Sequence, residues 1–339
     1  MTTFVPEPEQ SPALSIFIVA YNSAALISAC LGSIPDACRS HSYEVLLIDQ
    51  GDGSTRALVE HEVPHIRIVE DAGNIGFAGG NNLLAAEARG EMFLLLNPDV
   101  VLLPGAIDAL FAASERYPEA SAWGGVTLNR EGEPDNGNSV RFPSLSEMAS
   151  RVRGRSSARF DSSAVLACDQ QVQSLSGSFA MIRADAWREV GGFDESYFLY
   201  SEEVDLFYRL RSAGHDIWRI SSARAIHDIG HGNVHSRERI LFRAAGMMQF
   251  VRTHWPWWKR EVAFVLLWLA AIERWAFAKV LGRLFPSARA VGEGHTAMAR
   301  FPSRWRQGYR TDRGIGAELS DWRARRLGGT IEDRGAPGE

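Results

Sequence analysis

The sequence is poor in cysteine and in lysine. Its 339 residues include three cysteines, an odd number without CxxC spacing. This argues against a disulfide framework and a cysteine zinc site, and it favours a reducing compartment. The only lysines are Lys259 and Lys279, so arginine supplies nearly all of the positive charge. The formal net charge of -5 gives no general electrostatic reason to expect nucleic-acid binding.

Signals for export or membrane crossing are also scarce. The first twelve residues are acidic and proline-bearing, without a positively charged start or a long apolar stretch, so we expect no secretory signal. The apolar run Val262–Ile272 has eleven residues, whereas a spanning helix needs about twenty. We therefore expect a cytoplasmic protein.

The N-terminal part alternates strand-like and helix-like segments. Apolar runs with β-branched residues predict strands over 15–20, 43–48, 66–70 and 92–96, and helical spacing predicts helices between them. This alternation indicates an α/β fold with a mostly parallel, doubly wound sheet. After residue 104 the pattern loosens. Residues 129–159 have the composition of a long exposed loop, and periodicity fades after residue 287, which predicts a partly disordered tail.

Two aspartates end predicted core strands. Asp49 follows the run 43–48, and Asp99 follows 92–96 after Asn97 and Pro98, which stop the strand. Open α/β sheets bind ligands at the carboxyl ends of their strands. A carboxylate there suits a divalent cation and, through it, a phosphate. The alternative is that both are ordinary turn aspartates.

Three further segments carry polar or glycine residues in suggestive patterns. The glycine-rich stretch 74–82 precedes a predicted helix, and it fits a phosphate cradle or a helix-capping loop equally well. Glu202, Glu203 and Asp205 begin another predicted helix, where they complement its dipole or supply a general base. His227, His231 and His235 have metal-like spacing, but Gly230 and Gly232 make a regular helix unfavourable, so a single histidine beside Asp99 is the preferred interpretation.

Taken in order, these segments resemble the family 2 glycosyltransferases, in particular the bacterial branch that contains rhamnosyltransferases. The similarity runs from about residue 14 to about residue 255. The segments that carry it are 18–22 (IVAYN), 48–49 (ID), 74–82 (NIGFAGGNN), 96–99 (LNPD), 177–181 (GSFAM), 190–195 (VGGFDE), 202–206 (EEVDL) and His227.

The resemblance implies a GT-A type nucleotide-diphospho-sugar fold, a mixed and mostly parallel sheet flanked by helices, with a C-terminal helical extension. It implies an inverting, metal-assisted transfer of a sugar to a hydroxyl of a cell-surface glycan or a polyprenyl-linked acceptor, with dTDP-rhamnose as the first choice of donor. The roles it implies are Glu203 or Glu202 as the base; Asp99 and His227 as ligands of Mg2+ or Mn2+; Tyr21, Asn22, Asp49, Asn74, Gly76, Phe77, Asn82 and Asn97 as nucleotide contacts; and Gly177, Asp194 and Asp205 as acceptor contacts.

The chain departs from the family pattern at two places that matter for chemistry. Asn97 replaces the first acid of the metal-binding motif, and Glu203 stands where the family has an aspartate. Two other functions stay open. A non-catalytic sugar-nucleotide or glycan-binding subunit would accommodate the altered base. A sugar nucleotidyltransferase would need a basic, glycine-rich loop after the first strand, where this chain has Tyr21-Asn22-Ser23.

The expected organisation has four parts. Residues 1–13 form a tail; residues 14–253 form the catalytic domain, with a nucleotide-sugar half (14–128) and an acceptor half (129–253). An apolar helical extension follows at 254–286, and an Arg/Gly-rich tail at 287–339. Tryptophans are concentrated around the extension. It would lie peripherally on the inner face of the plasma membrane, or pack against the domain or a partner subunit.

Overall fold

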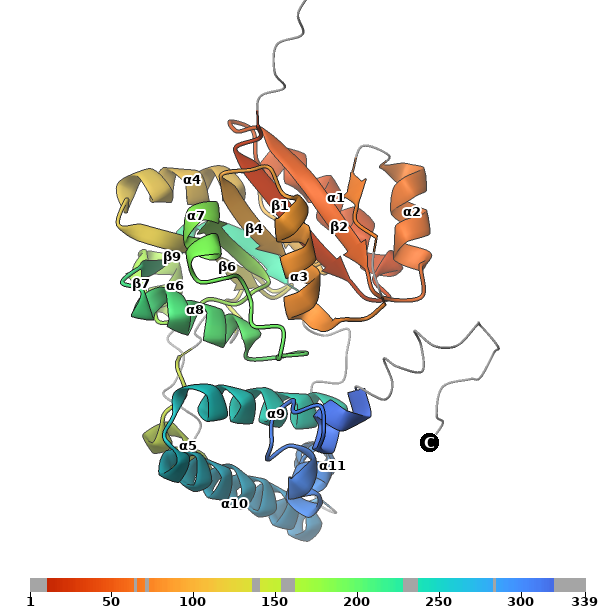
Figure 1. The fold of residues 1–339 in the computed structure, drawn as a ribbon, viewed down its shortest axis with the longest axis vertical. Helices are drawn as coiled ribbons and strands as arrows, with labels where there is room; N and C mark the ends of the chain where they lie inside the picture. The colour runs from red at the N-terminus through yellow and green to blue at the C-terminus, as the bar shows by residue number, and fades with distance from the viewer. Residues whose placement is uncertain are drawn as a thin grey trace, which may run out of the picture.

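The computed structural model describes residues 11–63, 66–70, 73–135, 141–153, 162–227, 237–282 and 285–319. Its centre is a nine-stranded mixed sheet in the order β3-β2-β1-β4-β8-β6-β9-β5, with β7 paired to β9 (Figure 1). The strands are β1 (Leu14–Ala20), β2 (Tyr43–Asp49), β3 (Arg67–Ile68), β4 (Met92–Leu96), β5 (Val100–Leu102), β6 (Ala120–Leu128), β7 (Gln170–Gln171), β8 (Phe179–Arg183) and β9 (Asp216–His227).

The N-terminal strands β1 to β4 are parallel, as the sequence predicts. In the β1–β2 register Leu14 faces Tyr43 and Ala20 faces Asp49, so both strands end at the same edge. Continuous apolar runs form them because helices cover both faces of the sheet. These helices are α1 (Ala24–Ala37), α2 (Ser54–Glu62), α3 (Gly76–Glu87), α4 (Ala106–Arg116), α7 (Ala184–Glu189) and α8 (Glu202–Ser212).

The strand β9 is longer than the expected segment 216–220, and its extension positions a site residue. It runs parallel to β6 as far as Ile226, with an irregularity between Gly125 and Val126. Its last residue, His227, pairs with Val100 of the short antiparallel strand β5. Because Asp99 immediately precedes Val100, this register brings the histidine beside the strand-end aspartate.

A helical layer lies below the sheet in Figure 1 and has an apolar core of its own. It consists of α5 (Leu145–Val152), α9 (Arg237–His254), α10 (Trp257–Leu281), α11 (Pro286–Arg300) and a 3-10 turn at Pro302–Arg304, while α6 (Ser162–Ala167) lies nearer β9. None of the helices in the described residues is long and apolar enough to cross a bilayer.

Two segments contain more regular structure than expected. The stretch 129–159, expected to be a loop, contains α5, whose Met148 is buried. The region after residue 287, expected to be a tail, forms most of α11 and continues into a segment with Trp305 and Tyr309 buried. The helix α11 lacks a clear apolar periodicity because small residues form its contact with α10. A Cβ added at Gly292 would lie 1.9 Å from the Cβ of Ala278 on α10. Close helix contact here therefore depends on glycine and alanine rather than on large apolar side chains.

Candidate active site

Three titratable side chains form a chain at the carboxyl end of the sheet. Nε2 of His227 lies 3.5 Å from Oδ1 of Asp99, and Nδ1 of the same ring lies 3.6 Å from Oδ2 of Asp135. Asp135 is the most buried side chain of the three, at 8% exposed, and Asp99 the least, at 31%. A carboxylate behind a histidine orients the ring and fixes which nitrogen faces a metal ion.

The electrostatics of this group favour a cation. Burial opposes a charge on His227, but hydrogen bonding and charge from Asp135 and Asp99 outweigh it and raise the pKa of His227 to about 9. A surplus of carboxylate around one imidazole is also what a divalent cation would neutralise. Carboxylate oxygen and imidazole nitrogen, with further positions left for substrate phosphates, are donors suited to Mg2+ or Mn2+. Asp135 lies in the stretch expected to be a loop, where no sequence motif marks it.

At the start of α8, Glu202 is buried and Glu203 is half-buried, with one of its carboxylate oxygens inaccessible. Glu202 is 4% exposed, and the Oε2 atoms of Glu202 and Glu203 are both inaccessible, with no hydrogen-bond partner in the described structure. Buried carboxylate oxygens without partners are rare in native proteins and call for a functional explanation. Burial, followed by the charge of Glu203, raises the pKa of Glu202 well above its ordinary value.

Glu203 is the glutamate of this pair that lies beside Gly177. A Cβ added at Gly177 would lie 3.9 Å from the Cβ of Glu203 and 3.1 Å from the ring of Phe77, so these three predicted site residues lie together. Burial raises the pKa of Glu203, while backbone N–H groups and the charge of Arg243 oppose the rise. Burial, followed by the charge of Glu202, raises the pKa of Tyr309 in the C-terminal segment.

Gly177 also connects this group to the end of β4. The N–H of Asn97 donates to the carbonyl oxygen of Ser178, the residue after Gly177, at 3.0 Å. Asn97 itself is half-buried, two residues before Asp99. The cluster of Asp99, His227 and Asp135 and the pair Glu202 and Glu203 therefore lie on either side of one backbone contact. This contact joins the end of β4 to the segment that leads into β8.

The glycine-rich segment 74–82 is held by protein contacts on both sides. The N–H of Gly76 donates to Oε1 of Gln50 at 3.1 Å and to Oδ1 of Asn74 at 3.0 Å, and Nε2 of Gln50 donates to the carbonyl oxygen of Gly76 at 3.2 Å. The N–H of Phe77 donates to the carbonyl oxygen of Phe198 at 3.2 Å. These two amides are thus already satisfied, and the segment ties the end of β2 to the loop before α8. The sequence analysis had not singled out Gln50.

The other strand-end acid shapes its own turn. Oδ1 of Asp49 accepts from the N–H of Gly51 and Oδ2 accepts from the N–H of Arg56, both at 2.9 Å. Asn22 has a left-handed backbone with φ 51° and accepts from the N–H of Asp52 at 3.1 Å. Tyr21 beside it is 53% exposed. The structure therefore brings Tyr21, Asn22 and Asp49 together, with the aromatic ring open to solvent.

Three predicted contact residues have structural partners instead of open faces. Asn82 bonds Phe193 through both ends of its amide, at 2.9 Å each. Asp194 accepts from the N–H of Ser196 within its own turn. Asp205 is 1% exposed, and its carboxylate pairs with Arg209 at 2.7 Å and His254 at 2.6 Å, joining α8 to α9.

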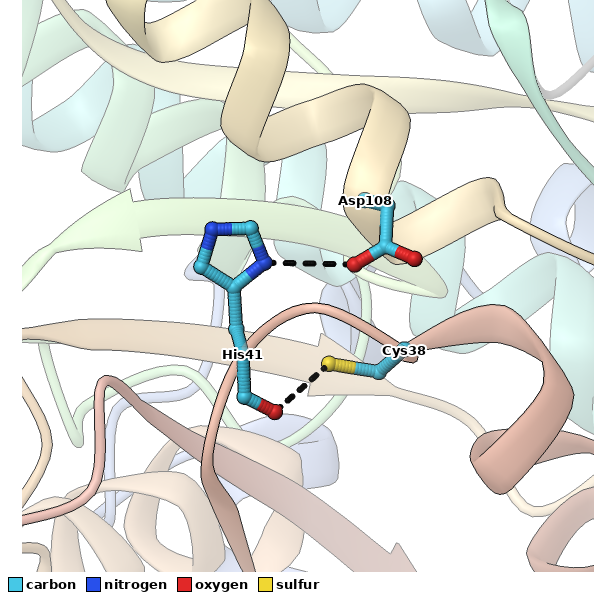
Figure 2. Close-up of side chains that lie close together, drawn as sticks. All are labelled: Cys38, His41 and Asp108. Carbon is cyan, nitrogen blue, oxygen red and sulfur yellow. Dashed lines mark hydrogen bonds and ion pairs between the residues drawn. The ribbon is translucent and has the colours of Figure 1, made fainter.

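A second cluster with metal-like chemistry lies between the loop after α1, which carries Cys38 and His41, and the first turn of α4, which carries Asp108 (Figure 2). Asp108 accepts from the N–H groups of Arg39 and Ser40 and lies 3.2 Å from Nδ1 of His41. Burial and the charge of Asp108 raise the pKa of Cys38 to about 11, so its thiol stays protonated and donates to the carbonyl oxygen of His41. These contacts join the loop to α4. His231 and His235 lie outside the described residues, so the structure does not bear on a three-histidine site.

The fold and this site define a glycosyltransferase of the GT-A type. Residues 15–191, just over half of the chain, match glycosyl transferase family 2, and the chain belongs to that family. The sequence-based fold class and family resemblance are thereby confirmed.

Relatives with assigned activities point to the same branch. The chain is 29% identical over 289 residues to the N-acetylglucosaminyl-diphospho-decaprenol L-rhamnosyltransferase of Mycobacterium tuberculosis, which covers 75% of this chain and 89% of that protein. It is 31% identical over 173 residues to rhamnosyltransferase WbbL of Escherichia coli, covering 48% of this chain and 64% of that protein. A mannosyltransferase of Pyrobaculum calidifontis, solved with GDP-Man and Mn2+, shares the fold with a TM-score of 0.51 and 17% identity, covering 88% of this chain and 84% of that one.

Proposed function

We propose that this glycosyltransferase moves a sugar, with inversion, from a nucleotide-diphospho-sugar to a hydroxyl of a glycan or lipid-linked acceptor. The observation that carries the proposal is the buried Oε2 of Glu203, which has no partner in the described structure and lies beside Gly177 and Phe77. Backbone N–H groups hold this carboxylate, but its Oε2 has no partner in the described structure. A buried carboxylate oxygen without a partner is suited to take a proton. This also favours catalysis over a binding-only subunit.

In the proposed reaction, Glu203 accepts the proton of the acceptor hydroxyl while the hydroxyl oxygen forms a bond to the anomeric carbon. The bond from that carbon to the diphosphate oxygen breaks, and the nucleoside diphosphate leaves with the electron pair. Attack from the face opposite the leaving group inverts the anomeric configuration. Burial makes Glu203 a stronger base than an exposed carboxylate, and the charge of Arg243 favours its ionised form.

Asp99 and His227 would hold a divalent cation, Mg2+ or Mn2+, with Asp135 orienting the ring. When bound, the ion supplies Lewis-acid neutralisation of charge on the departing diphosphate. The donor set supports this assignment, as does the presence of Mn2+ and GDP-Man in the mannosyltransferase of the same fold. Because the Asn97–Asp99 motif supplies only one carboxylate, His227 would be needed as the second protein ligand of the cation.

We assign the nucleoside to the edge formed by Tyr21, Asn22 and Asp49, where the exposed tyrosine ring offers a stacking surface. The proposed division is a nucleotide-sugar half over 14–128 and an acceptor half over 129–253. The rhamnosyltransferase names of the relatives favour dTDP-rhamnose as donor, and the decaprenol-linked substrate in the name of the mycobacterial relative favours a polyprenyl-linked acceptor.

A thermal-shift screen tests the donor assignment. Purified protein is heated with dTDP, UDP or GDP and with their sugars, each with and without Mn2+. A ligand that binds only the folded state raises the melting temperature according to its concentration relative to its Kd. We expect a metal-dependent shift with dTDP and dTDP-rhamnose. A shift with another nucleotide alone would overturn the donor, and no shift with any nucleotide would overturn the transferase proposal for the isolated chain.

A further inference from the structure

The outward side of α10 presents an apolar stripe, which is closely spaced from Trp258 to Leu269 and has one further member at Val280. Trp258, Val262, Val265, Leu269 and Val280 are between 41% and 73% exposed. At 100° per residue these positions fall on one line of the helix, which extends for about 33 Å. Scattered exposed apolar residues are ordinary, but a contiguous stripe marks an interaction surface.

The opposite side of the same helix is fully used in packing. Ala263, Leu267, Ala270 and Ala271 are at most 5% exposed and face the neighbouring helices α5, α9 and α11. Figure 1 places α10 at the border of the helical layer, on the side away from the sheet. The stripe is therefore not a continuation of the protein core.

Each end of the stripe carries tryptophan residues and a lysine. Trp257, 74% exposed, adjoins Trp258 at the first turn, and the ammonium of Lys259 lies 5.5 Å from a Trp258 ring centroid. Near the last turn, the ammonium of Lys279 lies 4.5 Å from the ring centroid of Trp275. Amphipathic aromatic rings with neighbouring cations are typical of helices lying in a membrane interface.

An arginine cluster adds to the charge at the first turn. Arg252, Arg260, Arg306 and Arg310 lie near enough to one another that, after burial, the last three depress the pKa of Arg252. The acids beside the stripe are already paired: Glu261 lies 2.6 Å from Arg306, and Glu273 lies 3.6 Å from Arg274. Arg306 and Arg310 are paired with Glu261 and Asp312, so Lys259, Arg252 and Arg260 supply the positive charge near this end of the stripe.

We infer that the outer face of α10 docks on an anionic phospholipid membrane, with the helix lying flat in the interface. A second copy of the chain fits this face less well. Because both ends of the stripe carry cations, two α10 helices that pack side by side would bring like charges together whether they run parallel or antiparallel. Anionic headgroups would instead neutralise both ends. The inference stands independently of the proposed donor and base. If the acceptor is lipid-linked, this docking would bring the site close to it. Only α10 would separate α9 from the bilayer, and α9 contacts the loop that leads into Glu203.

Vesicle flotation of the full chain tests the docking. Phosphatidylcholine vesicles with and without 30% phosphatidylglycerol are compared for the wild type, for Val265→Asp/Leu269→Asp and for Lys259→Gln/Lys279→Gln. The matched control is Leu83→Asp, which changes a leucine 37% exposed on α3. Circular dichroism melting establishes that each variant is folded.

We expect the wild type and Leu83→Asp to float only with anionic vesicles. The apolar double variant should lose at least tenfold in partitioning, and the lysine double variant about thirtyfold, since each basic residue near an anionic surface contributes about a fivefold effect. Wild type that remains soluble, or an apolar double variant that floats equally well, would overturn the inference. So would a dimer by light scattering that the apolar double variant converts to monomer, or flotation that appears only after removal of residues 320–339.

Discussion

The hydroxyl of Tyr309 donates a hydrogen bond to the carbonyl oxygen of Leu199, 110 residues earlier in the chain. The next two residues, Tyr200 and Ser201, have left-handed backbones with φ 68° and 72° and lead directly into Glu202 and Glu203. Consecutive non-glycine residues in this conformation cost about 1–2 kcal/mol each. The loop that aims the proposed base is therefore strained, and contacts from the C-terminal segment help to hold it.

Tyr309→Phe should lower kcat about fivefold and leave KM for the donor nearly unchanged. The variant removes only the hydroxyl, which donates to Leu199 and also contacts the carbonyl oxygen of Phe242 at 3.1 Å. One such hydrogen bond is worth about 1 kcal/mol. Tyr117→Phe is the control, since its hydroxyl bonds Asp169 on another part of the sheet. Equal losses in both variants, or a change confined to KM, would contradict a positioning role for Tyr309.

Gly246→Ala should strain the same loop from the side of α9. A Cβ at this position would lie 2.1 Å from the carbonyl oxygen of Tyr200, so helix or loop must shift. We expect a loss of about 1–3 kcal/mol in the free energy of unfolding, as for overpacked interiors, together with a fall in kcat. Gly32→Ala on α1 is the matched control, because nothing lies within 4 Å of its added Cβ. Denaturant unfolding of both variants checks this, and equal effects would contradict it.

Glu203→Gln should abolish most activity, by about 10²–10⁴-fold, and raise the melting temperature at neutral and alkaline pH. Burial raises the pKa of Glu203 above its ordinary 4.5, so the folded state binds this proton more tightly than the unfolded state. The wild type therefore loses stability as pH rises from about 4.5 through the raised folded pKa. Glutamine carries no charge, so its advantage should grow over that window and then level off.

Glu202→Gln separates the two glutamates. It should retain activity and leave the acid limb of the pH-rate profile in place. Burial and the charge of Glu203 raise the pKa of Glu202 well above its ordinary value, so Glu202 is the uncharged member of the pair while Glu203 ionises. In the wild type that limb should lie above the ordinary carboxylate range. If Glu202→Gln loses activity and Glu203→Gln retains it, then Glu202 is the general base and Glu203 is not.

Short-range patterns in the sequence were sufficient for the parallel half of the sheet and for the strand-end position of Asp99. They did not reveal β5, three residues long, because so short a strand is recognisable only through its pairing with β9. Gln50, Asp135 and Tyr309 were missed for a related reason. Each acts through contacts with segments that are distant in the sequence, and a lone polar residue in a loop carries no periodic signal. Conversely, Asn82 and Asp205 were predicted as ligand contacts because each belongs to a family motif. In the structure Asn82 bonds the backbone of Phe193, and Asp205 pairs with Arg209.

Asp135→Asn should raise the Mn2+ concentration needed for half-maximal activity by about 10–100-fold, the usual cost of losing a carboxylate behind a metal-binding histidine. The variant keeps the shape of the side chain but removes the charge 3.6 Å from Nδ1 of His227. Asp169→Asn is the matched control, since Asp169 also contacts β9, at Ser221, but lies away from the proposed ligands. Titrating Mn2+ in a donor-turnover assay measures the effect. If Asp99→Asn and Asp135→Asn both keep the half-saturating concentration of the wild type, then the Asp99–His227 pair is not where the cation binds.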